Sequence, residues 1–483
     1  MTEADVAAVI IMAAGAGTRM KSVRPKVLHE VAGRSMIAHA IKAANALAPD
    51  RLAVVIGHER EQVQQHLAEF APHVLIAVQE QPLGTGDAVR AGLSVLPDIS
   101  GEIVVTSGDV PLLKGETLRR LVASHRQTGS AVTVLTAVVP DATGYGRIIR
   151  AGDQVAAIIE HRDADQAQLE INEINSGIYV FDADLLRAGV DALTTANAQG
   201  ELYLPGVVAF ARQRGLGVNG YVLTDYLQAE GVNDRIELAA RNAELNRRIL
   251  RHWMAEGVTV VDPKTTWIHA DVDLAADVTL KPGTSLEGAT SVASGAVIGP
   301  DTTLIDVEVA ENAEVVRTHA VLSVIGAGAS VGPFAYLRPG TQVGERAKIG
   351  AFVEAKNAQL GAGAKVPHLT YCGDAIIGEG SNIGAGTIFA NYDGVTKSVT
   401  RVGAHSFVGS DSVLVAPLTI ADGAYVAAGS VVTRDVGAGE LAVARGQQRN
   451  VAGWVDRRRS GTAAQEAAKE AARTRDNTDG ENQ

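Results

Sequence analysis

Two groups of residues in this sequence could do chemistry, and the first follows an apolar run near the N-terminus. After residues 6–14 the chain continues with Gly15, Gly17 and Arg19 and, a few residues later, Lys26. Glycines let the backbone approach a phosphate closely, and the two cations can stabilise a polyphosphate and its transition state. The run lacks a dinucleotide fingerprint and a Walker loop, so neither of those sites is predicted. On their own, the glycines would also suit an ordinary turn between a strand and a helix.

The second group lies where a hexapeptide pattern is interrupted, over residues 366–377 and 383–402. His368 and Tyr371 fall in the first interruption, and histidine is the side chain best suited to take a proton near neutral pH. A lone histidine is more often structural, and Tyr371 alone would also suit simple packing. Cys372 lies nearby, but a Cys–His acyl-transfer pair needs a third orienting group, so we assign Cys372 to structure.

The hexapeptide pattern predicts the element that carries this second group. Between residues 268 and 432, an aliphatic residue recurs at every sixth position in three successive frames, often followed by glycine. Such a period fits a parallel β-helix with three flat faces per coil. Three hexapeptides make a coil of eighteen residues, so residues eighteen apart should stack about 4.8 Å apart. Arg338 should then stack on Lys356, and Ser410 on Ala428; the stacked cations would splay into water or hold an anion between them.

A different pattern positions the first group. Apolar runs alternate with helical stretches through residues 1–229, which predicts a doubly wound, Rossmann-like α/β domain with a mostly parallel sheet. Ligands of such sheets bind at the carboxyl ends of the strands, where Gly15 and Gly17 lie. Residues 230–256 have the spacing of a connecting helix, residues 257–453 form the β-helix domain, and the charged tail 454–483 is expected to be disordered or only weakly helical.

Composition narrows the possible partners. The 483 residues carry a formal net charge of -12, which argues against nucleic-acid binding and requires any phosphate to be held by local cations. The single cysteine excludes an internal disulfide framework and suits a reducing cytoplasm. We find no membrane span and no signal peptide, and we expect a cytoplasmic protein.

Several segments of the N-terminal half resemble the sugar-nucleotide pyrophosphorylases. The matching segments, in order, are Ala13 to Met20 with Pro25-Lys26, Gln79 with Leu83 to Gly86, Ser107-Gly108-Asp109, Gly144 to Ile148, Glu160-His161-Arg162, Glu173 to Gly177 and Gly231 to Asp234. The C-terminal half adds Tyr336 to Gly340, Glu354 to Asn357, His368 to Tyr371, Ser381 to Ala385 and Asn391 to Gly394. Together they resemble the bifunctional family of N-acetylglucosamine-1-phosphate uridylyltransferases and glucosamine-1-phosphate acetyltransferases over nearly the whole chain.

This resemblance implies a nucleotidyl-transfer site in the first domain. Arg19 and Lys26 would be catalytic, and Asp109 and Asn233 would be the protein ligands of Mg²⁺, a pairing that suits a hard cation. Gln79, Gly84 and Thr85 would contact the uracil side of UTP, and Gly146, Glu160 and Asn175 the amino sugar and ribose. The UTP and sugar site as a whole would comprise Ala13, Ala14, Gly15, Gln79, Gly84, Thr85, Ser107, Gly108, Asp109, Gly146, Glu160, Asn175 and Asn233. One departure is Pro205-Gly206, where the family pattern has Thr-Asp after Glu201 to Leu204; a sugar contact or the start of the local helix would be altered.

For the second half, the resemblance implies a left-handed β-helix that transfers acetyl groups from acetyl-CoA. His368 would be the general base, and Arg338 and Lys356 would clamp the sugar phosphate. The remaining site residues would be Tyr371 and Asn382 for the acceptor sugar, and Ala385, Asn391, Tyr392, Lys397, Ser410, Ala428 and Arg445 for acetyl-CoA. Related acyltransferases pack three β-helices side by side, so a homotrimer is expected. The product would serve synthesis of cell-wall (peptidoglycan) precursors.

Two other functions remain open at this level. A nucleotidyltransferase for a different sugar, with an inert β-helix, is disfavoured by the combination of His368, Arg338 and Lys356. A non-catalytic scaffold or exchange-factor subunit made of the same modules is disfavoured by the intact Lys26 and Asp109.

Overall fold

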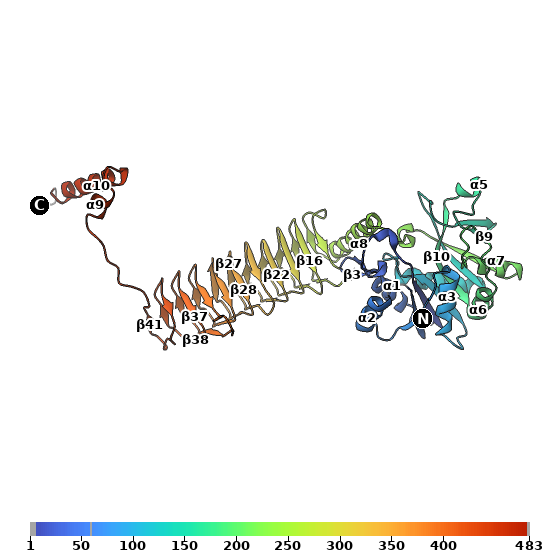
Figure 1. Ribbon diagram of the computed structural model, residues 1–483, viewed down its shortest axis with the longest axis horizontal. Helices are drawn as coiled ribbons and strands as arrows, with labels where there is room; N and C mark the ends of the chain where they lie inside the picture. Colours follow the sequence, from blue (N-terminus) through green and yellow to red (C-terminus); the bar gives the residue numbers. More distant parts are fainter. Residues whose placement is uncertain (1–5, 58–59, 481–483) are drawn as a thin grey trace. The chain divides into compact units, whose positions relative to one another are not determined.

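The computed structural model of this protein describes residues 6–57 and 60–480, with side chains as far as residue 473. It divides into two compact units, Met1–Arg346 and Ala347–Gln483, and each is described here by itself. In Figure 1 the first unit contains the blue and green sheet domain and the first, yellow coils of the β-helix, and the second contains the remaining coils and two C-terminal helices.

The N-terminal domain is built on a nine-stranded sheet with the order β5-β4-β1-β6-β10-β7-β11-β9-β8. The strands are β1 (Ala8–Ala13), β4 (Arg51–Ile56), β5 (Leu75–Val78), β6 (Glu102–Ser107), β7 (Val132–Val138), β8 (Arg147–Ala151), β9 (Gln154–Ile159), β10 (Glu173–Asp182) and β11 (Val218–Leu223). Strands β5, β4, β1 and β6 are parallel, whereas β10 is antiparallel to β6 and β7, and β8 to β9. The sheet is therefore mixed rather than mostly parallel. A tight turn rather than a crossover helix joins β8 to β9, which makes that pair antiparallel, and β10 runs antiparallel to both of its main neighbours.

Helices cover both faces of this sheet, as a doubly wound domain requires. They are α1 (Met36–Asn45), α2 (Arg60–Phe70), α3 (Thr85–Ser94), α4 (Gly115–Thr128), α5 (Gln166–Leu169), α6 (Ala183–Asp191) and α7 (Gly206–Gln213). Short 3₁₀ turns η1 (Thr18–Met20), η2 (Lys26–Leu28) and η3 (Tyr226–Ala229) and a hairpin of β2 (Glu30–Val31) and β3 (Arg34–Ser35) complete it. One apolar core packs α1, α2 and α4 against the sheet and a second packs α3, α6 and α7, so alternate side chains of each central strand are buried on opposite faces.

The predicted connecting helix is α8 (Arg235–Ala255), capped by the side chain of Asp234. Within the first unit, α8 is fastened to the first coil of the β-helix by the buried amide of Asn246, which donates to the carbonyl of Thr266 and accepts from the N–H of Ile268. The β2–β3 hairpin reaches the same coil, since the N–H of Ala270 donates to the carbonyl of Ala32.

The repeat region forms short parallel strands on three faces, one strand per face in each coil (Figure 1). The first unit contains β12 (Thr259–Val260), β13 (Trp267–Ile268), β14 (Asp273–Leu274), β15 (Thr279–Leu280), β16 (Thr284–Glu287), β17 (Ser291–Val292), β18 (Val297–Ile298), β19 (Thr302–Ile305), β20 (Glu308–Val309), β21 (Glu314–Val315), β22 (Thr318–Val321), β23 (Val324–Ile325), β24 (Ser330–Val331), β25 (Ala335–Leu337) and β26 (Gln342–Val343). The second contains β27 (Lys348–Ala351), β28 (Glu354–Lys356), β29 (Gln359–Leu360), β30 (Lys365–His368), β31 (Tyr371–Gly373), β32 (Ala375–Ile377), β33 (Asn382–Ile383), β34 (Ile388–Ala390), β35 (Thr400–Val402), β36 (Phe407–Val408), β37 (Val413–Val415), β38 (Leu418–Ile420), β39 (Tyr425–Val426), β40 (Val431–Val432) and β41 (Leu441–Ala442).

Coil length varies, which corrects the eighteen-residue rule. Leu280 pairs with Ile298 as predicted, but Ile298 pairs with Val315, and Val315 with Val331. Coils of sixteen or seventeen residues explain why the hexapeptide pattern changes frame along the sequence. When a corner is one residue shorter, every later aliphatic residue moves by one sequence position but still points into the β-helix core. The predicted stacking of Arg338 on Lys356 joins residues of the two units and stays a prediction.

Only one of the two predicted interruptions is a loop that leaves the stack. Over residues 366–377 the chain stays in register, because Cys372 takes the inward position and pairs with Ala355 in a coil shortened by one residue. Over residues 383–402 the chain does leave: Ile377 pairs with Val402, and residues 391–399 form a loop closed by an isolated bridge between Tyr392 and Lys397.

The tail contains helices where disorder or weak helicity was expected. Helix α9 spans Trp454–Arg458 and α10 spans Ala463–Gly480, and the side chain of Gln465 donates to Asp456 between them. The physical reason is composition, because the start of α10 is rich in alanine with glutamate, lysine and arginine, the strongest helix formers. The backbone after residue 480 lies outside the described residues. The domain limits given in the sequence analysis stay predictions.

Candidate active sites

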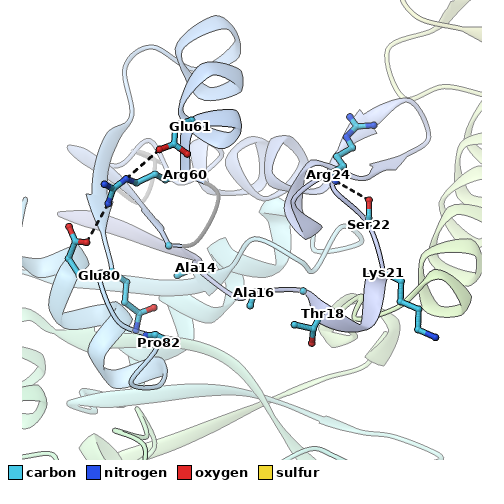
Figure 2. Close-up of a pocket in the computed structure, with 13 residues that line it drawn as sticks. Ala14, Ala16, Thr18, Lys21, Ser22, Arg24, Arg60, Glu61, Glu80 and Pro82 are labelled. Atoms are coloured by element: carbon cyan, nitrogen blue, oxygen red, sulfur yellow. Dashed lines mark hydrogen bonds and ion pairs between the residues drawn. The ribbon is translucent and has the colours of Figure 1, made fainter.

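The glycine-containing loop after β1 opens onto a cavity of about 870 Å³. Gly17 has φ +59°, and a Cβ atom there would lie 2.6 Å from Cβ of Lys26, so glycine lets the loop fold against this lysine. Figure 2 shows Ala14, Ala16 and Thr18 along one wall, with Lys21, Arg24 and Arg60 around the opening. The predicted catalytic Arg19 is exposed on η1 beside this cavity wall. A loop with open backbone and several cations suits an anionic polyphosphate.

Lys26, Asp109 and Asn233 converge although they lie far apart in the sequence. The Lys26 ammonium is 2.5 Å from Oδ2 of Asp109 and 3.5 Å from Oδ1 of Asn233. The other carboxylate oxygen of Asp109 accepts a hydrogen bond from Ser107, and the carbonyl of Asp109 accepts from the N–H of Val232. Strand β6 thus delivers Asp109, and the segment before α8 delivers Asn233 beside it.

This arrangement fits a magnesium ion. Oδ2 of Asp109 and Oδ1 of Asn233 come from different segments and both contact the Lys26 ammonium. A cation bound near this position could therefore be coordinated by both oxygens. Magnesium in nucleotide enzymes takes one or two protein oxygens and completes its shell with water and phosphate. Among residues 6–57 and 60–473, no group of three histidine, cysteine or acidic side chains is placed to hold a metal.

The residues expected at the nucleobase lie together at the start of α3. The buried side chain of Gln79 donates to the carbonyl of Gly84 and to Asp87, and its backbone continues β5. The hydroxyl of Thr85 accepts from the N–H of Leu204. These contacts fix the loop on which Gln79, Gly84 and Thr85 line the same small cavity as Gly15, Lys26 and Asp109.

The three residues expected at the sugar are also neighbours. The N–H of Asn175 donates to the carbonyl of Gly146, and a Cβ on Gly146 would lie 3.2 Å from Oε1 of Glu160. The side-chain oxygen of Asn175 accepts from the hydroxyl of Tyr179, which orients the amide. Burial raises the pKa of Glu160, and the nearby carboxylates Asp163 and Glu201 add to that shift.

The departure at Pro205-Gly206 falls at the start of α7. Pro205 takes the N-cap position, and no side-chain cap hydrogen bond is present there. Both residues line a cavity of about 460 Å³ that also includes Glu160 and Tyr203. Whether this segment changes a sugar contact or the helix start relative to the family stays a prediction.

In the second unit, His368 ends β30 and is exposed. Its carbonyl accepts from the hydroxyl of Thr370 and from the N–H of Gly386, which fixes the backbone on which the imidazole is carried. Tyr371 follows on β31, and its ring lies over Gly373: a Cβ there would be 2.5 Å from the Tyr371 hydroxyl and 2.8 Å from the amide nitrogen of Asn391. Glycine at 373 therefore leaves room for both the Tyr371 ring and the Asn391 amide.

The residues expected at acetyl-CoA lie along successive coils. The N–H of Asp411 donates to the carbonyl of Ala385, and the N–H of Gly429 to the carbonyl of Ser410. Arg445 donates from its guanidinium to the carbonyl of Ala428. The predicted stack of Ser410 and Ala428 agrees with these contacts, because the coils here are eighteen residues long. Asn382, expected at the sugar, pairs with Lys365 and Phe407 on the neighbouring coils.

The one cysteine, Cys372, is fully buried, and burial raises its pKa to about 12. A thiol that stays protonated at neutral pH is a poor nucleophile, which agrees with its assignment to structure.

Three residues near these sites were not singled out from sequence. Lys21 and Arg24 line the cavity beside Gly17, and their signal was the basic character of the loop between Arg19 and Lys26. Asp374 is buried between Asn357 and Asn391, and nothing in its spacing indicated this.

Family models match both halves of the chain. A MobA-like NTP transferase domain matches residues 9–167, a bacterial transferase hexapeptide model matches residues 323–356, and a hexapeptide repeat model of succinyl-transferase matches residues 399–434. These matches confirm the predicted order of an α/β nucleotidyltransferase domain followed by a hexapeptide β-helix.

Relatives match over nearly the full length. The bifunctional protein GlmU of Kineococcus radiotolerans is 53% identical over 96% of this chain and 95% of its own. The protein of the same name from Streptomyces avermitilis is 54% identical over 97% and 98%, and that from Corynebacterium diphtheriae 51% over 98% of both chains. Identity at this level, spread over both domains, shows that the chain belongs to the GlmU family of bifunctional enzymes, which combine a nucleotidyltransferase and an acyltransferase.

Proposed function

We propose that this chain makes UDP-N-acetylglucosamine in two steps, each catalysed in its own domain. The β-helix acetylates glucosamine-1-phosphate with acetyl-CoA, and the N-terminal domain then transfers UMP from UTP to N-acetylglucosamine-1-phosphate and releases pyrophosphate. The observation that carries this proposal is the convergence of Lys26, Asp109 and Asn233 at the carboxyl ends of the sheet strands. We infer that the product serves cell-wall precursor synthesis.

In the uridylyl step, the sugar phosphate attacks the α-phosphorus of UTP and pyrophosphate leaves. Arg19 and Lys26 offset the charge that builds up on the phosphate oxygens, and the backbone at Gly15 approaches them closely. Asp109 and Asn233 would hold Mg²⁺, which supplies further neutralisation of the phosphates when bound. With Mg²⁺ held by Asp109 and Asn233, the Lys26 ammonium, which contacts both residues here, would be available to neutralise the phosphate oxygens.

In the acetyl step, the amine of glucosamine-1-phosphate attacks the thioester carbon. The new C–N bond forms as the C–S bond breaks, and His368 takes the proton from the nitrogen. Coenzyme A leaves as the thiolate, which receives that proton and becomes the thiol. Arg338 and Lys356 hold the sugar phosphate, while Tyr371 and Asn382 orient the sugar ring.

We propose a homotrimer, in which neighbouring β-helices complete the acetyl site. Phe352 and Leu369, on adjacent coils beside His368, are 60% and 61% exposed in the single chain. Large apolar side chains at a reaction site call for a covering surface, and a second copy supplies one. Light scattering should give three times the mass of one chain; a monomer that still transfers acetyl groups would contradict this.

No helix in the described part of the chain is long and apolar enough to cross a membrane. We place the enzyme in the cytoplasm because UTP and acetyl-CoA are its substrates.

The direct test is incubation with glucosamine-1-phosphate, acetyl-CoA, UTP and Mg²⁺, with products identified by mass. Omitting UTP should leave N-acetylglucosamine-1-phosphate, and the full mixture should yield UDP-N-acetylglucosamine. Uridylyl transfer to another sugar phosphate without acetylation would favour a nucleotidyltransferase for a different sugar with an inert β-helix. The absence of both products would favour a non-catalytic scaffold protein.

A further inference from the structure

A buried carboxylate lies behind the acetyl site, in the second unit. Asp374 is 8% exposed and sits at a corner of the β-helix with φ +47°. One of its oxygens accepts from the amide of Asn357 at 2.8 Å, and the other accepts from the amide of Asn391 at 2.5 Å. The Lys356 ammonium lies 3.9 Å from the second oxygen. A single side chain thus contacts groups assigned to two different substrates.

Asp374 also holds both ends of the loop that leaves the stack. Its carboxylate binds Asn391, the first residue of that loop, and its carbonyl accepts from the N–H of Thr400, the residue that resumes the coil. Between these two attachments lie Tyr392 and Lys397, the remaining acetyl-CoA candidates of the loop. The position of the whole loop relative to β31 therefore depends on contacts of Asp374.

The charge of this carboxylate is maintained. Burial by itself would raise its pKa, but donation from Asn357 and Asn391 and the charges of Lys356 and Lys397 outweigh burial, so the pKa of Asp374 lies below its ordinary value. A side chain that accepts from two amide donors cannot be replaced by asparagine without loss, because one end of an amide is itself a donor. In Asp374→Asn, the amide of either Asn357 or Asn391 would face the new NH₂ group and would lose its hydrogen-bond acceptor.

We propose that Asp374 is a positioning residue for acetyl transfer: it fixes Lys356 for the sugar phosphate and the 391–399 loop for acetyl-CoA. It touches neither reacting atom. This inference rests on the proposed function of the β-helix, since Lys356 and Asn391 matter only if acetylation takes place there.

The test compares full-length Asp374→Asn with the wild type. We expect KM to rise about tenfold for both glucosamine-1-phosphate and acetyl-CoA, the usual cost of a disrupted charged hydrogen bond, while kcat stays within about threefold. Uridylyl transfer, assayed with N-acetylglucosamine-1-phosphate, should be unchanged. Unchanged KM values for both substrates, or a loss of kcat that follows a lower melting temperature without a change in KM, would overturn the proposal.

A second variant guards against a misfolded Asp374→Asn. Asn357→Gly removes one donor to Asp374 and places at this position a residue that tolerates the left-handed backbone. It should raise both KM values by about threefold, because Asp374 loses one of its two amide partners. No rise in this variant would count against the proposal even if Asp374→Asn failed to fold.

The matched control is Asp306→Asn. Asp306 also has a left-handed backbone, with φ +52°, at a β-helix corner, and it accepts from the N–H of Ala289. It should leave both KM values unchanged. If the wild type itself shows no acetyl transfer, the proposed function fails; if the wild type acetylates and Asp374→Asn equals it, only the positioning role fails.

Discussion

The two candidate sites are built by opposite strategies. In the N-terminal domain, Lys26 meets Asp109 and Asn233 across 83 and 207 residues of chain. In the β-helix, Asn357, Asp374 and Asn391 meet in steps of 17 residues, one coil at a time. A wound sheet gathers distant segments at its strand ends, whereas a solenoid brings together residues one coil apart. A regular coil restricts the contacts of the second site to residues one coil apart, but the coil length that selects them, 17 residues here rather than the predicted 18, is known only from the structure.

The largest expected effect separates the two sites completely. Asp109→Asn removes the anionic oxygen that faces Lys26 and the proposed metal, so uridylyl transfer should fall by about 10³-fold or more. Acetyl transfer should be unaffected, because its residues lie on a different fold. Coupled assays of both reactions on one preparation measure this, with the exposed Asp98→Asn as control. Equal loss of both activities would show that the sites are not independent.

The second prediction concerns His368. His368→Ala should lower kcat for acetyl transfer by about 10²-fold with little change in KM, the usual contribution of a general base. Uridylyl transfer should stay at the wild-type rate. His319→Ala, which removes an exposed histidine on β22, is the control. Wild-type acetylation by His368→Ala would exclude the proposed role.

A third prediction sharpens the difference within the acetyl site. Arg338→Ala and Lys356→Ala should each raise KM for glucosamine-1-phosphate by about tenfold, because each removes one charged hydrogen-bond donor to the phosphate. KM for acetyl-CoA should change less for Arg338→Ala. Initial rates measured over a range of concentrations of both substrates give the two KM values. If Arg338→Ala raised only the KM for acetyl-CoA, the assignment of Arg338 to the sugar phosphate would be wrong.

The smallest expected effect tests the sugar side of the first site. Because the pKa of Glu160 is raised, the folded protein binds its proton more tightly than the unfolded chain, so ionisation of Glu160 destabilises the fold as pH rises. Glu160→Gln should therefore raise the melting temperature by about 1–3 °C at pH 7.5 and not below pH 4. The same change should raise KM for N-acetylglucosamine-1-phosphate. A lower melting temperature at pH 7.5 would contradict the burial argument.

Sequence alone determined the two folds and their order. The period of six at Leu280 and Ile298 can be satisfied only by a coil with inward corners, and the family motifs identified Asp109 and His368 as candidates. It could not determine the sheet's antiparallel strands or the real coil lengths, because both depend on which turns are tight. In the β-helix, for example, Cys372 takes an inward position in a coil of 17 residues, pairing with Ala355.

Only the tertiary structure decided which charges meet. The sequence did not place Lys26 between Asp109 and Asn233, since their approach depends on where β6 and the start of α8 end in space. Nor did it indicate Asp374, whose importance lies in a buried carboxylate with two amide donors rather than in a motif. A periodic pattern reports which side chains point inward, because burial selects residue type; it carries no information on which polar groups find one another, because those contacts are set by the folded geometry of distant segments.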